Sequence, residues 1–299
     1  MFNTVNSILQ QLEDPKGLLK GVKIFVKRDD LIDNLVSGNK WRKLKYNLLE
    51  AKRRKNTQLL TFGGAYSNHL VATAKACALA DIPAIGIVRG DELNSQSNQT
   101  LQMCTEYGMT LKFIPRAEYT LRNDKMYIDQ LHDEYPNTFI VPEGGANFFG
   151  MIGCQEIWSE LPDVNFSKVY VSAGTGTTAS GLIAGLPIGV RLQVISALKG
   201  DFMYSTVKER LMYSFFDEEL VEEKLSQVDF HDDNLFGGYA KATESLLDFM
   251  EWVNVEFNLP LDKVYTAKTF YHLVQQINAG EILEGEHVLF IHTGGLQGN

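Results

Sequence analysis

The sequence predicts an α/β protein built on mainly parallel β-sheet with helices on its faces. Short apolar segments alternate with longer amphipathic ones along the chain, which is typical of repeated βα units. Several of the short segments are apolar throughout, as expected for strands that are buried on both faces. The length of 299 residues favours about two domains.

The expected strands are runs of four to six residues, and the segments between them have the spacing of amphipathic helices. In chain order the strands are KIFVK (23–27), QLLTF (58–62), AIGIV (84–88), LKFI (111–114), TFIV (138–141), KVYVS (168–172), LQVISA (192–197) and HVLFIH (287–292). The expected helices are 41–55, 66–80, 96–107, 120–135, 149–160, 177–186, 205–215, 239–257 and 267–279. Segment 199–238 is polar and acidic with a weak helical period, so we expect surface helices and a loop there.

Composition argues against several classes of protein. The net charge of -9 disfavours nucleic acid or an anionic membrane as the main partner. Cys77, Cys104 and Cys154 are odd in number and far apart, which supports neither a disulfide framework nor a zinc site, and no histidine pair suggests a metal. The first two are expected to be buried thiols. The N-terminus lacks the pattern of a signal peptide and no apolar run could span a membrane, so we expect a cytoplasmic protein.

Four of the expected strands end in glycine-rich turns. Glycine permits left-handed turns and close approach of a ligand to the backbone. In open α/β sheets, ligands bind at the carboxyl ends of the strands, so these turns predict one crevice built from several of them. The alternative is that glycine only ends strands and starts tight loops. The turns lie in segments 59–69, 139–150, 169–181 and 289–298.

The third turn predicts an anion site. A strand leads into it and a helix leaves it, so backbone N–H groups and threonine hydroxyls gather at a helix N-terminus. It lacks the lysine of a Walker A loop. Its third position of G-x-G-x-x-G is Ala179, and no acidic ribose partner follows, so a nucleotide-binding α/β protein remains a weaker alternative. A single phosphate monoester fits better. The predicted phosphate-binding residues are Gly174, Thr175, Gly176, Thr177 and Thr178.

Six motifs in order resemble the family of 1-aminocyclopropane-1-carboxylate deaminases and D-cysteine desulfhydrases. They are VKRDDLIDNLVSGNKWRKLKY, TFGGAYSNHLVATA, VPEGGANFFG, SAGTGTTASGL, DKVYTAKTF and LFIHTGG, and they span residues 26 to 295. The resemblance implies pyridoxal 5'-phosphate as cofactor, a small amino-acid substrate and a homodimer. It also implies the fold-type II architecture of the tryptophan synthase β subunit, with two open twisted, mainly parallel sheets. Residues 1–45 and 157–299 would form a larger cofactor-binding domain and 46–156 a smaller one, with the active site in the cleft between them.

The resemblance implies that Lys40 forms the Schiff base with the cofactor. Lys40 follows Gly38 and Asn39 at an expected helix start, where a positive charge is disfavoured. A nucleophilic lysine needs a lowered pKa, and a helix N-terminus with cations nearby acts in that direction. The neighbouring cations themselves are expected to lie on a solvated helix face: Arg42, Lys43 and Lys45.

The second motif is expected to contact cofactor and substrate. By resemblance, Asn68 hydrogen-bonds the cofactor's ring hydroxyl, and Ser67 with nearby N–H groups holds the substrate carboxylate. An ordinary N-cap role for Ser67 is the alternative. His69 stands where deaminases often have Gln and is expected at the wall of the substrate site, together with Gly144 and Gly145.

Two tyrosines and one threonine complete the predicted site. Tyr265 and Tyr239 fall where the family keeps active-site tyrosines, although either one could be a packing residue. Thr266 follows Tyr265 where typical deaminases have a Glu near the pyridine nitrogen, and Thr293 stands where they have Leu. A neutral hydroxyl leaves the cofactor a weaker electron sink, so these two positions favour the D-cysteine desulfhydrase branch.

The sequence therefore predicts a lyase or deaminase, classed also as a hydrolase, that performs β-elimination. D-cysteine-like substrates would yield an α-keto acid and ammonia, plus sulfide, with Lys40 moving a proton at the α-carbon. One alternative is a 1-aminocyclopropane-1-carboxylate deaminase. Another is a non-catalytic homologue that binds pyridoxal phosphate or an amino acid, because the chain stops soon after HTGG, where family members usually continue.

Overall fold

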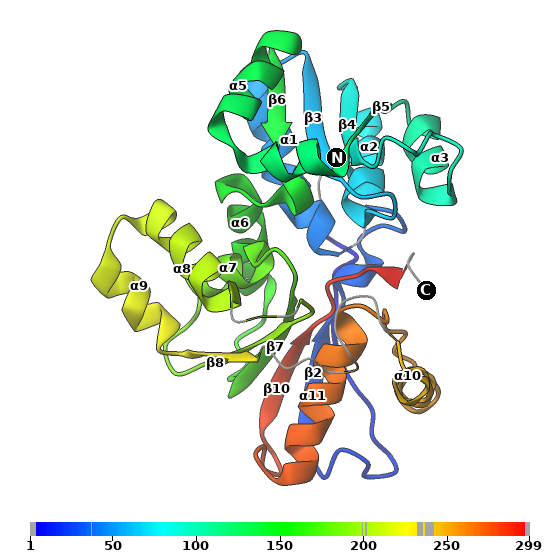
Figure 1. Ribbon diagram of the computed structural model, residues 1–299. Helices are drawn as coiled ribbons and strands as arrows, with labels where there is room; N and C mark the ends of the chain where they lie inside the picture. The colour runs from blue at the N-terminus through cyan, green and yellow to red at the C-terminus, as the bar shows by residue number, and fades with distance from the viewer. Residues whose placement is uncertain are drawn as a thin grey trace. The chain divides into compact units, whose positions relative to one another are not determined.

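A computed structural model describes residues 4–36, 38–198, 200, 202–231, 236 and 242–296 (Figure 1). The chain forms two compact units. The described part of the first comprises Asp33–Val36 and Lys40–Gly153. The second comprises Thr4–Ile32, residues 38–39 and the described chain from Cys154 onward. The longest segment of the first unit is Lys40–Gly153, whereas the sequence suggested 46–156 for the smaller domain.

The first unit contains a four-stranded sheet in the order β5-β4-β3-β6. All three strand pairs are parallel, as the alternation of strands and helices predicts. The strands are β3 (Gln58–Gly63), β4 (Ala84–Arg89), β5 (Thr110–Ile114) and β6 (Thr138–Val141). The helices are α1 (Asn39–Arg53), α2 (Asn68–Ala80), α3 (Gln99–Glu106), α4 (Arg116–Tyr119), α5 (Lys125–Glu134) and α6 (Phe148–Gln155), with 3₁₀ turns at Thr120–Asn123 and Glu143–Gly145.

Helices cover both faces of this sheet. Leu60 and Phe62 of β3 form one cluster with Tyr119 of α4 and with Tyr127 of α5, so α4 and α5 pack on that face. Side chains alternate along a strand, so Thr61 and Gly63 point to the opposite face, which α2 covers. The central strands are buried on both sides, which explains their uninterrupted apolar sequences.

The second unit contains a six-stranded sheet in the order β1-β2-β10-β7-β8-β9. Only the β1–β2 pair is antiparallel. The strands are β1 (Leu9–Gln11), β2 (Lys23–Lys27), β7 (Lys168–Ala173), β8 (Arg191–Ser196), β9 (Val228–His231) and β10 (His287–Ile291). The helices are α7 (Thr177–Ala184), α8 (Phe202–Phe215), α9 (Glu218–Leu225), α10 (Glu244–Phe257) and α11 (Thr266–Ala279), with 3₁₀ turns at Asp29–Leu31 and Glu156–Glu160.

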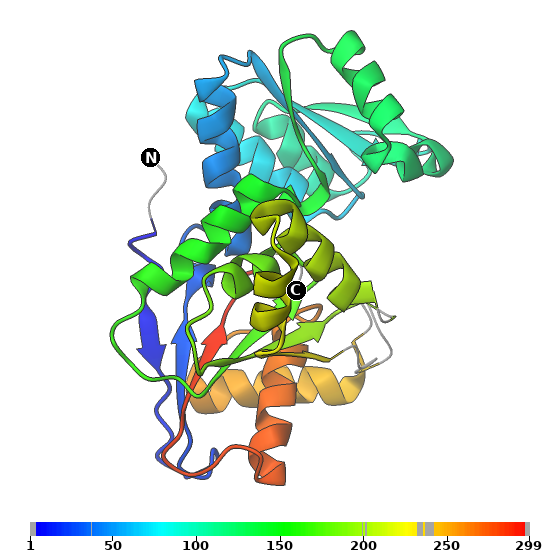
Figure 2. The ribbon, with the colours of Figure 1, turned by 90° about the vertical axis from the view of Figure 1, so that its left-hand side faces the viewer.

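One face of this sheet packs against α10 and α11, which cross one another in Figure 2. Their buried side chains join those of β2, β7 and β10 in one hydrophobic cluster that includes Phe270, Leu273 and Phe290. Helix α7 packs on β7, and α8 packs on α7 in turn. The predicted fold class, with two mainly parallel sheets and helices on both faces, is confirmed.

Three elements differ from the sequence prediction. Segment 199–238 was expected to hold helices and a loop, yet 228–231 forms strand β9 at the sheet edge, and β1 lies at the other edge. An edge strand pairs on one side only and need not be apolar, so VDFH and LQQ carry little strand signal. The expected helix 120–135 is interrupted at Asp124, where the backbone is extended. The Asp124 side chain is the N-cap of α5 and accepts a hydrogen bond from the Tyr127 N–H.

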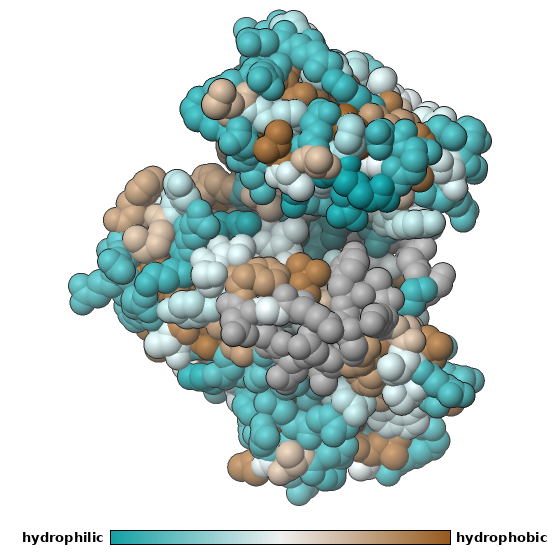
Figure 3. Space-filling model, in the orientation of Figure 1, coloured by the Kyte–Doolittle hydropathy of each residue, from teal (hydrophilic) through white to brown (hydrophobic). Residues whose placement is uncertain are grey.

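Neither unit has a helix, among the described residues, that is long and apolar enough to cross a bilayer. On the face shown in Figure 3, hydrophobic residues lie in small groups among hydrophilic ones. Cys77 and Cys104 are buried free thiols on α2 and α3, as expected.

Candidate active site

The four glycine-rich turns fall at the carboxyl edges of the two sheets, two on each. β3 and β6 are parallel neighbours, so the turns that follow them leave the same edge of the four-stranded sheet. β7 and β10 are likewise parallel neighbours in the six-stranded sheet. Each sheet therefore presents a pair of adjacent turns at the edge where ligands bind in open α/β folds.

Gly38 and Asn39, the two residues before Lys40, contact two of these turns. Gly38 has φ +62°, and a Cβ there would lie 1.9 Å from the carbonyl oxygen of Thr293, just after β10. The Asn39 backbone N–H donates to that same oxygen over 3.2 Å. The Asn39 side chain Nδ2 donates to Thr178 Oγ1 over 3.0 Å. Asn39 thus joins the HTGG turn to the Gly/Thr turn immediately before Lys40.

The Gly/Thr turn has the donors that a phosphate monoester needs. Gly176 is the N-cap of α7 with φ +75° and makes no side-chain cap, so the first-turn N–H groups have no acceptor within the helix. The hydroxyls of Thr175 and Thr177 lie 3.1 Å apart. The side chains of Thr177 and Thr178 are buried. These residues fit the phosphate of the cofactor that the sequence implies.

Tyr265 lies beside this turn. A Cβ on Gly174 would meet Cε1 and Oη of Tyr265 at 3.1 Å, so the glycine leaves room for the phenol ring. Thr266 is fully buried, and its hydroxyl donates to Asp262 Oδ1 over 2.8 Å and accepts from the Asp262 N–H over 2.7 Å. The structure therefore places Tyr265 against the Gly/Thr turn, and places the Thr266 hydroxyl in the cap of α11.

In the first unit, Ser67 is the N-cap of α2. Its Oγ accepts from the Leu70 N–H over 3.3 Å, which is the structural role considered for it. A Cβ on Gly63 would lie 2.7 Å from Ser67 Oγ, so this glycine makes room for the cap. The side chain of Asn68, the first residue of α2, is half-buried and makes no hydrogen bond within the described residues.

His69 is a buried, neutral acceptor. The Thr61 hydroxyl donates to the Val141 carbonyl over 2.8 Å, so it must accept from His69 Nε2, which lies 2.8 Å away. Nδ1 is then an acceptor, and it is buried without a partner in the described part of the chain. Burial, with the charges of Lys40 and Lys43 next in importance, lowers the pKa of His69 to about 3. The ring offers a hydrogen-bond acceptor to a ligand.

Gly144 and Gly145 form a turn beside His69 and Lys43. Both glycines have left-handed backbone, with φ +69° and +70°. A Cβ on Gly145 would lie 3.0 Å from Lys43 Cβ and 3.7 Å from His69 Cε1. The structure thus brings together the turn after β6, the start of α2 and the first turn of α1.

The expectation of a solvated face for Arg42, Lys43 and Lys45 is wrong for two of the three. Arg42 is 0% exposed and Lys43 3% exposed. A Cβ on Gly153 of α6 would lie 1.9 Å from the Arg42 carbonyl oxygen, so α6 packs directly on this turn of α1. Only Lys45 is partly exposed, with Nζ 5.0 Å from the Tyr46 ring centre. Lys43 lies three residues after Lys40 and therefore on the same side of the helix. The sequence did not predict it as part of the site, although its side chain is buried beside Gly145.

The predicted site residue Tyr239 lies outside the described residues.

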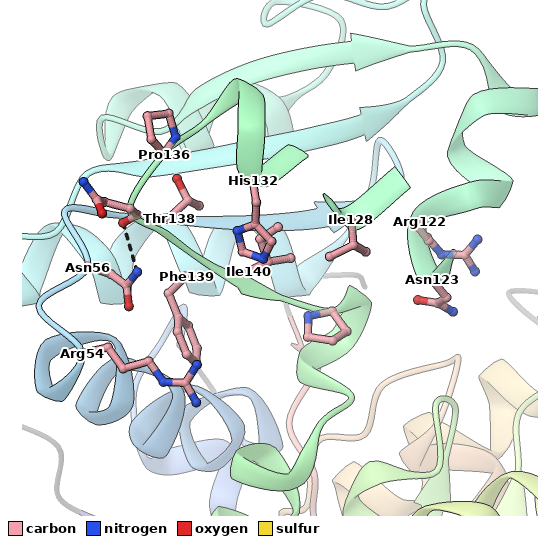
Figure 4. A pocket seen from close by; sticks show the side chains of 12 residues that line it. Arg54, Asn56, Arg122, Asn123, Ile128, His132, Pro136, Thr138, Phe139 and Ile140 are labelled. Carbon is pink, nitrogen blue, oxygen red and sulfur yellow. Dashed lines mark hydrogen bonds between the residues drawn. The ribbon is translucent and has the colours of Figure 1, made fainter. Parts of the chain in front are cut away.

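The first unit also contains a pocket of about 640 Å³ that involves none of the predicted site residues (Figure 4). It is lined by Arg54, Arg122 and Phe139 among others. Its two arginines are paired with carboxylates of Glu50 and Glu143. Within the described chain, no group of three metal-ligating side chains is found.

Comparison with known proteins gives consistent matches over nearly the whole chain. Residues 7–294 match the family model described as pyridoxal-phosphate dependent enzyme. A Pyrococcus furiosus protein named "Putative 1-aminocyclopropane-1-carboxylate deaminase" is 30% identical over 292 residues, covering 94% of this chain and 87% of that protein. The mitochondrial "Bifunctional D-cysteine desulfhydrase/1-aminocyclopropane-1-carboxylate deaminase" of Arabidopsis thaliana is 30% identical, covering 94% and 74%. The crystal structure of an "ACC deaminase homologue" superposes with a TM-score of 0.80 at 27% identity, covering 100% and 92%.

The expected additional class of hydrolase is wrong. The relatives are named for deaminase and desulfhydrase activities, which are lyase reactions. In an elimination, the bond to the leaving group breaks as a neighbouring proton is removed, and water is not the attacking group. The lyase and deaminase classes agree with the relatives, and the hydrolase class does not.

The family model and both relatives match nearly the whole chain, so the matches extend over both units. The chain belongs to the pyridoxal-phosphate-dependent enzymes and, within them, to the family of 1-aminocyclopropane-1-carboxylate deaminases and D-cysteine desulfhydrases.

Proposed function

We propose that this enzyme is a lyase that performs β-elimination on D-cysteine-like amino acids. The products would be an α-keto acid, ammonia and the β-substituent, which for D-cysteine is sulfide. One water is consumed after the carbon–sulfur bond has broken, so that D-cysteine and water give pyruvate, ammonia and hydrogen sulfide. The bifunctional Arabidopsis relative, named for D-cysteine desulfhydrase activity, supports this choice of substrate.

One observation carries the proposal. The Asn39 side chain bonds Thr178 over 3.0 Å, so the residue before Lys40 is attached to the turn that would bind the cofactor phosphate. A cofactor held by its phosphate in that turn is thereby brought to the start of α1. Pyridoxal phosphate, when bound, supplies an electron sink for the pair left at the substrate α-carbon.

In this proposal Lys40 Nζ is the attachment point of the cofactor and the group that takes the α-proton. Gly174, Thr175, Gly176, Thr177 and Thr178 hold the phosphate through N–H groups and hydroxyls. Tyr265, whose hydroxyl lies against Gly174, is placed to donate or accept a proton next to this turn. Tyr239 keeps the same predicted role from its motif.

The first unit supplies the substrate contacts. The Ser67 hydroxyl proton remains available, because its oxygen serves the cap of α2 as an acceptor, and the α2 N-terminus favours a carboxylate. Asn68 would hold the ring hydroxyl of the cofactor. His69 Nδ1 would accept a hydrogen bond from a bound ligand. Gly144 and Gly145 keep the space beside it open.

The second candidate is 1-aminocyclopropane-1-carboxylate deamination. Thr266 and Thr293 favour elimination, because a neutral hydroxyl near the pyridine nitrogen makes a weaker electron sink. However, Thr266 donates its proton to Asp262, a buried carboxylate 2.8 Å away. Thr266 then offers only a lone pair, and a negative charge lies one hydrogen bond behind it. This arrangement favours a protonated ring nitrogen and keeps the second candidate open.

The experiment compares the wild type with Lys40→Ala and Lys45→Ala after reconstitution with pyridoxal phosphate. Lys45 lies on the same helix against the Tyr46 ring, so its replacement is a matched control. We expect a visible absorption band in the wild type and the control that is lost in Lys40→Ala. Each protein is then incubated with D-cysteine, L-cysteine or 1-aminocyclopropane-1-carboxylate. Sulfide, pyruvate, 2-oxobutanoate and ammonia are measured, with free cofactor as the blank.

Lys40-dependent sulfide and pyruvate from D-cysteine would support the proposal. 2-Oxobutanoate without sulfide would replace it by the second candidate. A band with no product from any of these substrates would leave a binding protein, and no band after reconstitution would overturn the proposal altogether.

We also propose that the enzyme is a cytoplasmic homodimer. All three cysteines are free and buried, which fits a reducing compartment. The dimer follows from the family resemblance. Light scattering after gel filtration would measure the mass of the assembly, and a tagged copy expressed in its cell of origin would give the compartment.

A further inference from the structure

Helix α8 places an arginine directly behind the phosphate-binding turn. Arg210 Nη1 donates to the Thr175 carbonyl over 2.8 Å. A Cβ on Gly176 would lie 3.3 Å from Arg210 Nη1, from Met203 Sδ and from Val207 Cγ2. The glycine is therefore in close contact with three side chains of α8, which packs beside α7 (Figure 1). Arg210 lies within segment 199–238, which no motif of the sequence marked.

This contact decides which way the turn presents its donors. In a trans peptide, the N–H of the next residue points away from the preceding carbonyl, and the chain has no cis peptide in its described part. A Thr175 carbonyl directed at Arg210 therefore turns the Gly176 N–H to the opposite side. The first-turn N–H groups of α7 also have no acceptor within the helix. Arg210 thus keeps the carbonyl, which would repel an anion, behind the turn.

The positive charge of Arg210 also favours binding of an anion at this turn. Its guanidinium makes no salt bridge among the described residues, and burial lowers its pKa from the ordinary value, although an arginine stays charged. Among the described residues this cation is hydrogen-bonded to a neutral carbonyl, and the charge of Glu209 offsets the effect of burial on its pKa only in part. An anion on the other side of the turn would favour the charged guanidinium further.

We propose that Arg210 is a positioning residue for the cofactor phosphate. It holds the Thr175 peptide so that the Gly176 N–H and the first turn of α7 face the phosphate, and it adds a positive charge behind them. This inference rests on the proposed use of the Gly174–Thr178 turn as the phosphate site. Arg210 itself does not touch the reacting atoms.

The test distinguishes binding of the phosphate group from binding of the rest of the cofactor. Arg210→Met and Arg210→Gln are compared with Lys208→Met, a control on the same helix whose partly exposed ammonium pairs with Glu222 of α9. Cofactor-free protein is titrated with pyridoxal phosphate and with pyridoxal, which lacks the phosphate, and the absorption band is followed. We expect the Kd for pyridoxal phosphate to rise roughly 10- to 100-fold in both Arg210 variants, as for loss of a charged hydrogen bond. The Kd for pyridoxal should change less than about 3-fold.

Thermal stabilisation by inorganic phosphate gives a readout that does not involve Lys40 or turnover. The wild type and Lys208→Met should be stabilised by phosphate, and the two Arg210 variants should not. Equal weakening of pyridoxal phosphate and pyridoxal, or unchanged affinity for both, would overturn the inference. If the wild type binds no pyridoxal phosphate, the proposed function fails. The inference is then decided by inorganic phosphate: loss of stabilisation in the Arg210 variants supports it, and unchanged stabilisation overturns it.

Discussion

At the residue scale, Gly38 determines where the lysine-bearing helix can begin. Its φ of +62° suits glycine, and no side chain fits there, because the Thr293 carbonyl oxygen lies 1.9 Å from the Cβ position. The contact lets Asn39 reach both Thr293 and Thr178. The absence of a side chain at Gly38 thus allows Asn39 to bond both Thr293, after β10, and Thr178, in α7.

Gly38→Ala should lower the free energy of unfolding by about 2–5 kcal/mol, from the left-handed backbone and the collision together. Gly285→Ala is the matched control, because Gly285 has φ +83° with nothing within 4 Å of the Cβ position. We expect that variant to lose only about 1–2 kcal/mol. Urea unfolding measures both, and equal losses would show that the contact with Thr293 does not matter.

His69 should make stability depend on pH. The unfolded imidazole binds a proton below about pH 6.5, whereas the folded protein keeps His69 neutral down to about pH 3. Because the unfolded state then binds more protons, stability falls as pH falls through this window, by at most about 1.4 kcal/mol per unit. At pH 7 and above the effect is absent.

When the pH is lowered from 6.5 to 4.5, the wild type should lose about 2 kcal/mol of its free energy of unfolding through His69. His69→Gln lacks this imidazole and should not show that part of the loss. Urea unfolding at the two pH values gives the comparison. His132→Gln, a replacement of an exposed histidine on α5, serves as the control and should follow the wild type. Parallel pH curves for wild type and His69→Gln would contradict the buried, neutral state of the ring.

At the element scale, the start of α11 is held by one carboxylate. Asp262 accepts hydrogen bonds from the backbone N–H groups of Val264, Tyr265 and Thr266, and from the Thr266 hydroxyl. Four donors on one side chain satisfy groups that a helix start leaves without partners. Tyr265 is positioned by this cap, so the helix terminus and the predicted proton donor form one local structure.

Thr266→Val should cost about 1–3 kcal/mol of stability, because it leaves the buried Asp262 N–H without its acceptor. Thr266→Ser keeps the hydroxyl and should stay within about 1 kcal/mol of the wild type. Chemical denaturation of both variants tests the cap. The idea would be wrong if serine were as damaging as valine.

At the scale of the whole molecule, each unit has its own sheet and its own hydrophobic cluster. Leu60 and Phe62 belong to the cluster of the first unit, and Leu273 and Phe290 to that of the second. A chain with two separate cores need not unfold in one two-state transition.

Calorimetry of the full chain should resolve two components. Leu60→Ala should shift one component and Leu273→Ala the other, since each removes a side chain that is 0% exposed, at about 2–5 kcal/mol. The two replacements are matched controls for each other. A single transition that both variants shift equally would mean that the units unfold together.

The sequence by itself determined the fold class and, through its motifs, the cofactor of the family. Strand and helix periods are local properties, and parallel strands buried on both faces need uninterrupted apolar runs. The Gly/Thr turn was also recognised from its sequence, because glycine and hydroxyl residues gather at a strand–helix junction, and its use as a phosphate site stays a prediction. The edge strands β1 and β9 were not predicted, because strands that are only partly buried need no apolar run.

Only the tertiary structure decided which side chains support the site. Asn39 meets Thr178 across 139 residues of sequence, and no local pattern encodes such a hydrogen bond. Arg42 and Lys43 look like solvated cations in the sequence, yet α6 and the Gly144–Gly145 turn bury them. Arg210 comes from a segment without any motif. Burial and long-range hydrogen bonds depend on what packs against an element, whereas periodicity and turn chemistry depend on the element alone.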